Sequence, residues 1–97
     1  MVEKLERLSA AGIQLLDTGI PNHYVFERDG FVALVERKGE AFGNIGAPAK
    51  LVEGGVAPLV WRGERAFFVN KTFEREAAGG EVAALRSFDA ELRQALA

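Results

Sequence analysis

The chain contains no cysteine and only one histidine, His23. The lack of cysteine excludes disulfide bonds and thiolate metal sites. Paired histidines at metal-binding spacing are also missing, and the carboxylates do not follow the spacing of an EF-hand loop. We therefore expect no metal and no cofactor.

Neutral polar residues are scarce as well. Ser, Thr, Asn and Gln number nine in 97 residues, whereas Glu and Arg number 11 and 8. A surface rich in charge and poor in amides is typical of thermophile proteins. We interpret the chain as bacterial and thermophile-like. A mesophile with a high-GC genome is the alternative explanation, because such genomes also favour Arg, Ala and Gly.

A basic excess and long hydrophobic runs are missing too. The net charge of −2 argues against nucleic-acid binding, which usually needs a basic face. Residues 1–16 are charged from Glu3 onward, so no signal peptide is expected. No stretch approaches the roughly 20 apolar residues of a membrane span. These features predict a cytoplasmic protein, and 97 residues, 48% of them hydrophobic, predict a single globular domain over 1–97.

Two runs of β-branched and aromatic residues dominate the chain, and a tight-turn dipeptide interrupts each. Residues 23–37 turn at Asp29-Gly30, a pair preferred in type I′ turns. Residues 56–71 turn at Gly63-Glu64, with glycine at the first position of a type II′ turn. Two β-hairpins are predicted, each with its register set by a two-residue loop.

Both ends of the chain show helical periodicity. Residues 2–11 predict a short helix that ends at Gly12, with Ile13 placed to contact Leu8 as in a Schellman cap. Residues 81–96 predict the main helix. Its apolar stripe recurs at three- and four-residue spacing: Val82, Leu85, Phe88, Leu92 and Leu96.

The remaining segments are shorter. Residues 17–22 are turn formers, and 41–45 predict an extra strand. Pro48 suits the first turn of a helix, so 48–53 predict a short helix, and 72–78 predict a connection with one helical turn. The expected fold class is α+β: an antiparallel β-sheet built from the hairpins at about 23–37 and 56–71, with the N- and C-terminal helices at about 2–11 and 81–96 packed on one face.

Both hairpins are apolar on both faces. Four or five strands span about 20–24 Å, whereas a helix is about 10 Å across, so the terminal helices suffice for one face only. The face expected beneath them carries Tyr24, Phe26, Phe31, Leu59, Trp61 and Phe68. The other face carries Val25, Val32, Leu34, Val60, Phe67 and Val69, with a charged rim of Glu27, Glu36, Arg62 and Arg65. An apolar centre with a charged rim predicts a homodimer through this face. A three-layer monomer is the alternative.

The segment 39–50 is rich in glycine and leads toward the predicted short helix. Backbone N–H groups there predict an anion site, with Gly43, Asn44, Gly46 and Lys50 as the ligand-binding residues. The segment matches neither a Walker A loop nor the G-x-G-x-x-G motif. Glycines that form a tight turn under the sheet are the plainer and preferred interpretation.

No catalytic constellation assembles from the remaining polar side chains. His23, with Glu36 or Asp17 beside it, is a weak general-base candidate, and Ser9 and Ser87 lack a nucleophile-elbow setting. Trp61 is expected in the core. The sequence therefore favours a non-catalytic interaction or accessory protein that acts as a homodimer. A small-molecule or anion-binding domain using 39–50 is the alternative, and an enzyme is the least favoured class.

Overall fold

The computed structural model of the chain describes residues 2–16, 20–39, 41–52 and 55–97. It has the predicted α+β architecture, with two helices and an eight-stranded, mostly antiparallel, curled sheet. The elements in chain order are α1 (Val2–Ala10), β1 (Gln14–Leu16), β2 (His23–Arg28), β3 (Phe31–Lys38), β4 (Ala41–Ile45), β5 (Ala49–Val52), β6 (Gly55–Arg62), β7 (Arg65–Val69), β8 (Glu74–Glu76) and α2 (Gly79–Leu96).

Both predicted hairpins form, in the predicted register. Asp29 and Gly30 have φ of 53° and 86°, as a type I′ turn requires. Gly63 has a φ of 66°, which suits the first position of a type II′ turn. The cross-strand partners include Phe26 with Ala33, Glu27 with Val32, Val60 with Phe67, and Trp61 with Ala66.

The end of α1 is also as predicted. Ile13 N donates to Leu8 O at 2.9 Å, and Gly12 N donates to Ser9 O at 3.0 Å, which is the Schellman pattern. Gly12 has a φ of 75°, a conformation that glycine adopts without a Cβ penalty. Leu8 and Ile13 are both buried in the main core, so the cap directs the chain from α1 into β1.

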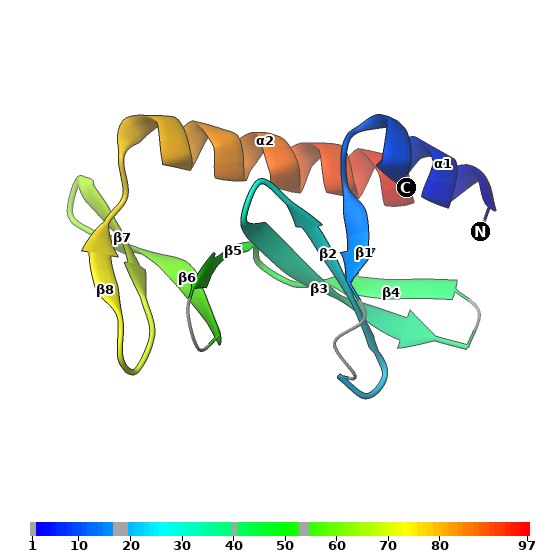
Figure 1. Cartoon of the computed structure of the whole chain (residues 1–97), viewed down its shortest axis with the longest axis horizontal. Helices are drawn as coiled ribbons and strands as arrows, with labels where there is room; N and C mark the ends of the chain where they lie inside the picture. Colours follow the sequence, from blue (N-terminus) through cyan, green and yellow to red (C-terminus); the bar gives the residue numbers. More distant parts are fainter. Residues whose placement is uncertain (1, 17–19, 40, 53–54) are drawn as a thin grey trace.

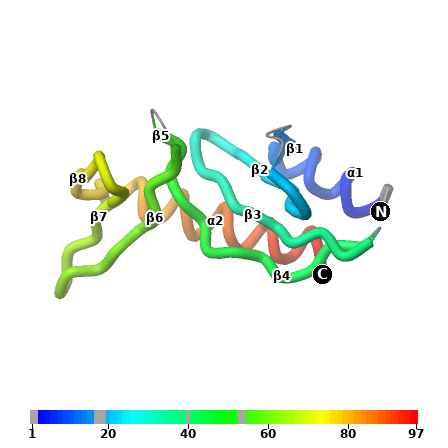
Figure 2. Tube along the Cα trace, turned by 90° about the horizontal axis from the view of Figure 1, so that it is seen from below, coloured from blue at the N-terminus to red at the C-terminus, as the bar shows by residue number. Residues whose placement is uncertain are grey.

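Both helices lie on one face of the sheet, as predicted. Figure 1 shows α2 running along the top of the molecule with α1 beside its end, and Figure 2, from below, shows the strands in front of α2. The core between these layers takes its largest side chains from β2, β3, β7 and α2: Phe26, Phe31, Phe68, Leu85, Phe88 and Leu92. We call the helix-covered side of the sheet the inner face and the opposite side the outer face.

The sheet divides into two lobes at β5 and β6. The strand order is β1-β2-β3-β5-β6-β7-β8, and β4 pairs with the other half of β3. Gly55–Pro58 of β6 pair with β5, and the rest of β6 pairs with β7. Proline has no N–H to donate to a ladder, and Pro58 is the last β6 residue paired with β5. Strands β1–β4 form the first lobe, and β6–β8 form the second (Figure 1).

Two predicted segments are wrong. The helix expected over 48–53 is strand β5 over Ala49–Val52, because Lys50 pairs with Phe31 on one side and Ala57 on the other. The connection expected over 72–78 contains strand β8 instead of a helical turn. Strand pairing with distant segments overrides local helix signals in both cases. Helix α2 begins at Gly79 rather than 81, and the turn residues predicted at 17–19 lie outside the described residues.

Candidate functional site

The outer face of the first lobe is covered by its own chain. Val25 and Val32, predicted to contact a partner, are only 5% and 1% exposed. They form a small cluster with Ala49 of β5, against which Leu16 and Leu34 pack from the sides. These two valines therefore have little surface left for contact with another molecule.

The outer face of the second lobe is covered differently. The guanidinium carbons of Arg62 and Arg65 lie 5.0 Å and 5.4 Å from the ring centroid of Phe67. Arg62 Nη2 donates to Glu74 Oε1 at 2.8 Å, and Arg65 donates to both carboxylate oxygens of Glu76 at 2.6 Å and 2.9 Å. We call this arrangement the arginine layer: Arg62, Arg65, Glu74 and Glu76 over Phe67.

The charges of the arginine layer are thus matched within the chain. The hydrogen bonds from Arg65 lower the pKa of Glu76, and the same bonds raise the pKa of Arg65. The sequence pattern predicted Arg62 and Arg65 at the rim. It did not predict strand β8, which supplies the carboxylates that pair with them. The two guanidinium groups also make cation–π contacts with the Phe67 ring and shield it from water.

The acidic rim residues of the first lobe also have contacts within the chain. Glu27 accepts hydrogen bonds from Gln14 Nε2 at 2.7 Å and from the backbone N of Gly30 at 3.1 Å. Glu36 Oε1 lies 3.6 Å from Lys38 Nζ. Glu27 therefore helps to hold the first hairpin turn and the edge strand β1.

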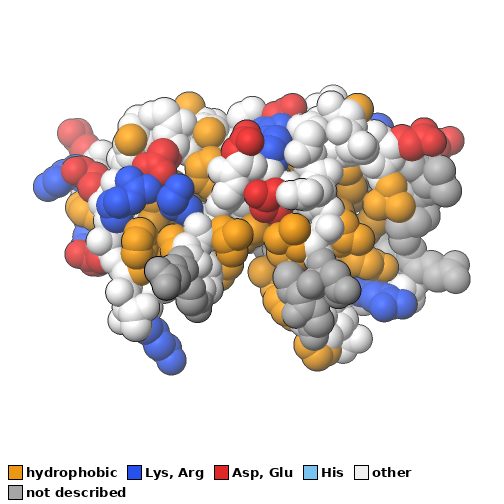
Figure 3. All heavy atoms as spheres, viewed as in Figure 1, with side chains coloured by type: hydrophobic (Ala, Val, Ile, Leu, Met, Phe, Trp, Pro, Cys, Tyr) orange, Lys and Arg blue, Asp and Glu red, His pale blue; other side chains and the backbone are white. Residues whose placement is uncertain are grey.

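An apolar strip stays exposed where the two lobes meet on the outer face. Leu51 of β5 is 46% exposed, and Val56 and Val60 of β6 are 39% and 38% exposed. Leu51 lies opposite Val56, and the exposed Pro58 shares their side of β6. We call Leu51, Val56, Pro58 and Val60 the outer strip. Figure 3 shows the molecule hollowed between the lobes at its lower edge, with hydrophobic side chains along the hollow.

Sequence reasoning found Val60 in this strip but missed Leu51 and Val56. Leu51 was assigned to a helix that does not form, and Val56 was not given a face. A usable signal was present, because a glycine pair between two short apolar runs also predicts a hairpin. Of the other predicted outer residues, Leu34, Phe67 and Val69 are partly buried.

Gly43, Asn44 and Lys50 of the predicted anion site lie on strands, and Gly46 directly follows β4. Gly43 and Asn44 belong to β4 and Lys50 belongs to β5, so a strand stands over 49–52 where the helix with free N–H groups was expected. A Cβ on Gly43 would lie 2.9 Å from Glu36 Oε1, and one on Gly46 would lie 3.1 Å from Leu34 O. Close packing against β3 thus accounts for these two glycines.

Lys50 is part of a partly exposed ion cluster centred on Glu81. Lys50 Nζ lies 3.0 Å from Glu81 Oε2, and Arg75 donates to both Glu81 oxygens at 2.9 Å and 2.7 Å. The backbone N of Ala78 donates to Glu81 Oε1 at 3.1 Å, which caps α2. The bonds from Arg75 are the main reason that the pKa of Glu81 falls to about 2. Lys50 also lies over the rings of Phe31 and Phe68.

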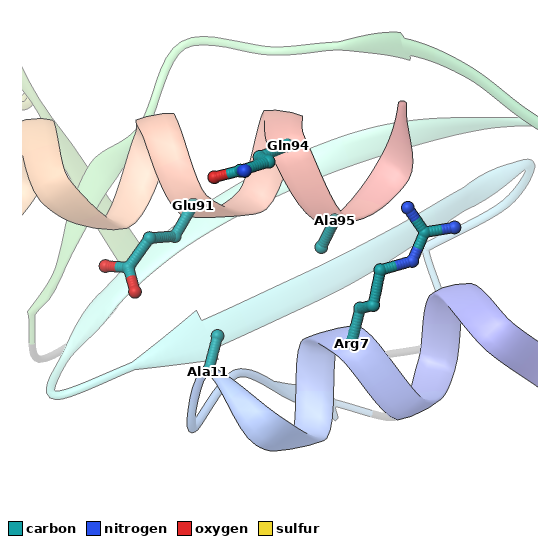
Figure 4. Close-up of a pocket in the computed structure, with 5 residues that line it drawn as sticks. All are labelled: Arg7, Ala11, Glu91, Gln94 and Ala95. Carbon is teal, nitrogen blue, oxygen red and sulfur yellow. The ribbon is translucent and has the colours of Figure 1, made fainter.

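A second ion pair fixes the other end of α2. Arg28 Nη2 lies 2.8 Å from Glu91 Oε2, and Arg28 Nη1 donates to Ala11 O at 2.9 Å. Hydrogen bonds from Arg28 and then from Ser87 lower the pKa of Glu91. Figure 4 shows the neighbouring hollow of about 290 Å³ between α1 and α2, lined by Arg7, Ala11, Glu91, Gln94 and Ala95.

The histidine and serine candidates have ordinary contacts. His23 is exposed, with Nδ1 2.9 Å from Pro21 O, and Ser87 Oγ donates to Glu91 Oε2 at 2.8 Å. Asp17, considered as a partner of His23, lies outside the described residues. Over the described ranges, no group of three His, Asp or Glu side chains is placed to hold a metal ion. Neither α1 nor α2, as far as the chain is described, is long and apolar enough to cross a membrane.

Comparison with protein-family models, with curated proteins and with solved structures finds no match for this chain.

Proposed function

We propose that the chain is a non-catalytic interaction or accessory protein that works as a homodimer, with the two copies meeting through the outer strip. The observation that carries this proposal is the exposure of Leu51, Val56 and Val60 on the paired strands β5 and β6, on the outer face of the sheet. A contiguous apolar patch rimmed by polar groups is a common mark of a protein interface.

The surface area of the single chain supports a missing partner. The chain exposes 6080 Å², whereas a folded monomer of 10.5 kDa is expected to expose about 5,400 Å². The radius of gyration is 13.6 Å, against roughly 12.5 Å for a typical domain of this length. The excess area is of the order of the ~800 Å² that each partner buries in a standard interface.

The charge distribution supports a second copy as the occupant. The charges of the arginine layer are paired within the chain. Two copies that approach face to face therefore bring neutral ion pairs together, and their outer faces do not repel each other as two surfaces of like charge would. A two-fold axis sets each surface against its own copy, which suits an uncharged apolar strip such as Leu51, Val56 and Val60.

The alternative of a small-molecule or anion-binding domain has less support. Its cation, Lys50, is already paired with Glu81, and its glycines pack against β3. We retain self-association as the function that the geometry supports best.

The cellular setting that goes with this proposal is the cytoplasm of a thermophilic bacterium. A chain without cysteine needs no oxidising compartment. The ion cluster of Lys50, Arg75 and Glu81 is the type of surface network that thermophile proteins favour.

Size-exclusion chromatography with light scattering tests the dimer. We expect twice the chain mass of 10.5 kDa at micromolar concentration. Leu51→Glu should give the single-chain mass, because two carboxylates would be buried at the two-fold interface. The matched control is Leu5→Glu, which changes an exposed leucine of α1 on the helix side and should stay dimeric. A wild-type chain that elutes as a monomer, or dissociation by Leu5→Glu alone, would overturn the proposal.

A further inference from the structure

Trp61 departs most clearly from the sequence-based expectation. It lies near the end of β6, pairs with the buried Ala66 and faces the helix layer, yet it is 49% exposed. The guanidinium carbon of Arg86, on α2, lies 5.5 Å from its ring centroid. The indole is therefore held in place at the open end of the core rather than packed inside it.

A hollow of about 320 Å³ adjoins this indole, and Gly79 and Val82 near the start of α2 are among its lining residues. Trp61 and Val82 form part of its wall, together with the small residues Ala66, Ala77 and Gly79. Ala77 N donates to Ala66 O at 2.9 Å, so the small side chains belong to a hydrogen-bonded part of the sheet. The volume lies at the lower end of the roughly 300–1,000 Å³ found for binding sites.

Three charged side chains line the hollow, Glu64, Arg65 and Glu76, and the guanidinium of Arg86 lies beside it over Trp61. Arg65 and Glu76, two of its lining residues, neutralise each other through two hydrogen bonds. Glu64, in the turn between β6 and β7, is exposed, and no salt bridge joins it to another side chain in the part of the chain that the structure describes. A positive group on an incoming molecule would therefore find an available carboxylate at Glu64.

We infer that this hollow receives an aromatic side chain of a partner protein, with a lysine or arginine next to it in the partner's sequence. The aromatic ring would pack against Trp61 and the small residues, and the basic neighbour would pair with Glu64. Tryptophan and arginine are the residue types most enriched at the energetic centres of interfaces. Trp61 and Val82 lie on the side of the helix layer and not on the outer face, so the inference does not rest on the proposed homodimer.

Trp61 is the only tryptophan, so its fluorescence reports on the hollow directly. The probe is the peptide Ac-Lys-Phe-Lys-NH₂, titrated into the full chain. We expect a saturable change in emission. Ac-Lys-Ala-Lys-NH₂ and Ac-Glu-Phe-Glu-NH₂ should each bind about tenfold more weakly or not at all, because they lack the ring or reverse the charge. No saturable response to the first peptide, or equal affinity for all three, overturns the inference.

Two matched pairs of variants locate the site. Val82→Phe fills the hollow and should abolish the response, whereas Ala90→Phe, at an exposed position on the same helix, should keep it. Glu64→Lys should reverse the preference between the lysine and glutamate peptides. Glu6→Lys makes the same change in net charge on α1 and should leave the preference unchanged.

Circular dichroism melts confirm that each variant is folded before titration. If Val82→Phe fails to fold, the comparison of Glu64→Lys with Glu6→Lys still tests whether the peptide binds at this hollow. A response that survives Val82→Phe, or an unchanged preference in Glu64→Lys, overturns the inference. Phenethylamine serves as a last probe, and if it binds as tightly as the peptide the site is one for small amines and the assignment to a protein partner is wrong.

Discussion

The two hairpins share one sequence design but bury their outer faces by different means. In the first, Val25 and Val32 are enclosed by aliphatic side chains from β1, β3 and β5. In the second, Phe67 lies under the arginine layer, and Val60 stays exposed. The inner faces of both hairpins, by contrast, join one core beneath α2.

The difference follows from the neighbours that each hairpin has in the sheet. Strand β3 pairs with β2, β4 and β5, so its outer face lies in the middle of a curved surface. Strand β7 has β6 on one side and only the three-residue β8, with the sequence Glu-Arg-Glu, on the other. Charged short edge strands protect a sheet from unwanted pairing. Here the same strand also supplies carboxylates to Arg62 and Arg65.

The comparison shows that an apolar strand face does not always need another protein to cover it. Curvature can close a face on itself, and long cationic side chains can lie over an aromatic ring. Among the described residues of the outer face, those of the outer strip, at the junction of the lobes, have neither kind of cover. The proposed self-association therefore concerns this strip and not the whole outer face.

The largest difference in the free energy of unfolding should separate substitutions at two adjacent residues of β7, because their side chains lie on opposite faces of the sheet. Phe68 is fully buried in the core, so Phe68→Ala should lower the free energy of unfolding by about 3–5 kcal/mol. Phe67→Ala should lower it by only about 1 kcal/mol, since the ring is only partly buried, beneath two arginines that are exposed to water. Urea denaturation of the two variants measures the difference. Equal losses in the free energy of unfolding would mean that the arginine layer buries Phe67 as effectively as the core buries Phe68.

A smaller difference in the free energy of unfolding should separate valine substitutions on the outer face of the first lobe from those on the outer face of the second. Val32→Ala removes two methyl groups from a buried site and should lower the free energy of unfolding by about 2 kcal/mol. Val60→Ala should cost less than about 0.5 kcal/mol in the single chain. Denaturation must be followed at concentrations low enough to dissociate any dimer. A loss at Val60 as large as that at Val32 would contradict the contrast drawn between the lobes.

The smallest effect concerns the carboxylates that tie α2 to the rest of the fold. The pKa of Glu81 is lowered from 4.5 to about 2, so in the folded chain Glu81 holds its proton less tightly than in the unfolded chain. Its contribution to stability is therefore complete above about pH 4.5 and is lost as the pH falls toward 2. Glu81→Gln should cost about 1 kcal/mol at pH 7, less than the pKa difference alone implies, because the ion pairs are partly in water.

Melting temperatures between pH 7 and pH 2 test this expectation. The wild-type value should fall more steeply below pH 4.5 than that of Glu81→Gln. The control is Glu91→Gln, whose carboxylate pairs with Arg28 and whose side chain is more exposed, so its curve should stay closer to wild type. Parallel curves for wild type and Glu81→Gln would show that Arg75 and Lys50 do not stabilise the ionised carboxylate.

The sequence by itself determined the local geometry of this protein. Asp29-Gly30 and Gly63 favour turns that need positive φ, and a two-residue turn sets the register of the strands beside it. Gly12 and Ile13 determined the end of α1 in the same way. These features depend on residues within a few positions of one another, so no knowledge of distant contacts was needed to predict them.

Only the tertiary structure decided how the faces are covered. Residues 49–52 form a strand because Lys50 pairs with Phe31 on one side and with Ala57 on the other. Strand β8 pairs with β7 in the same way. Those pairings enclosed Val25 and Val32, supplied Arg62 and Arg65 with carboxylates, and left Leu51, Val56 and Trp61 exposed. The physical reason is that burial and ion pairing here join residues distant in the sequence, and their proximity depends on the curvature of the whole sheet.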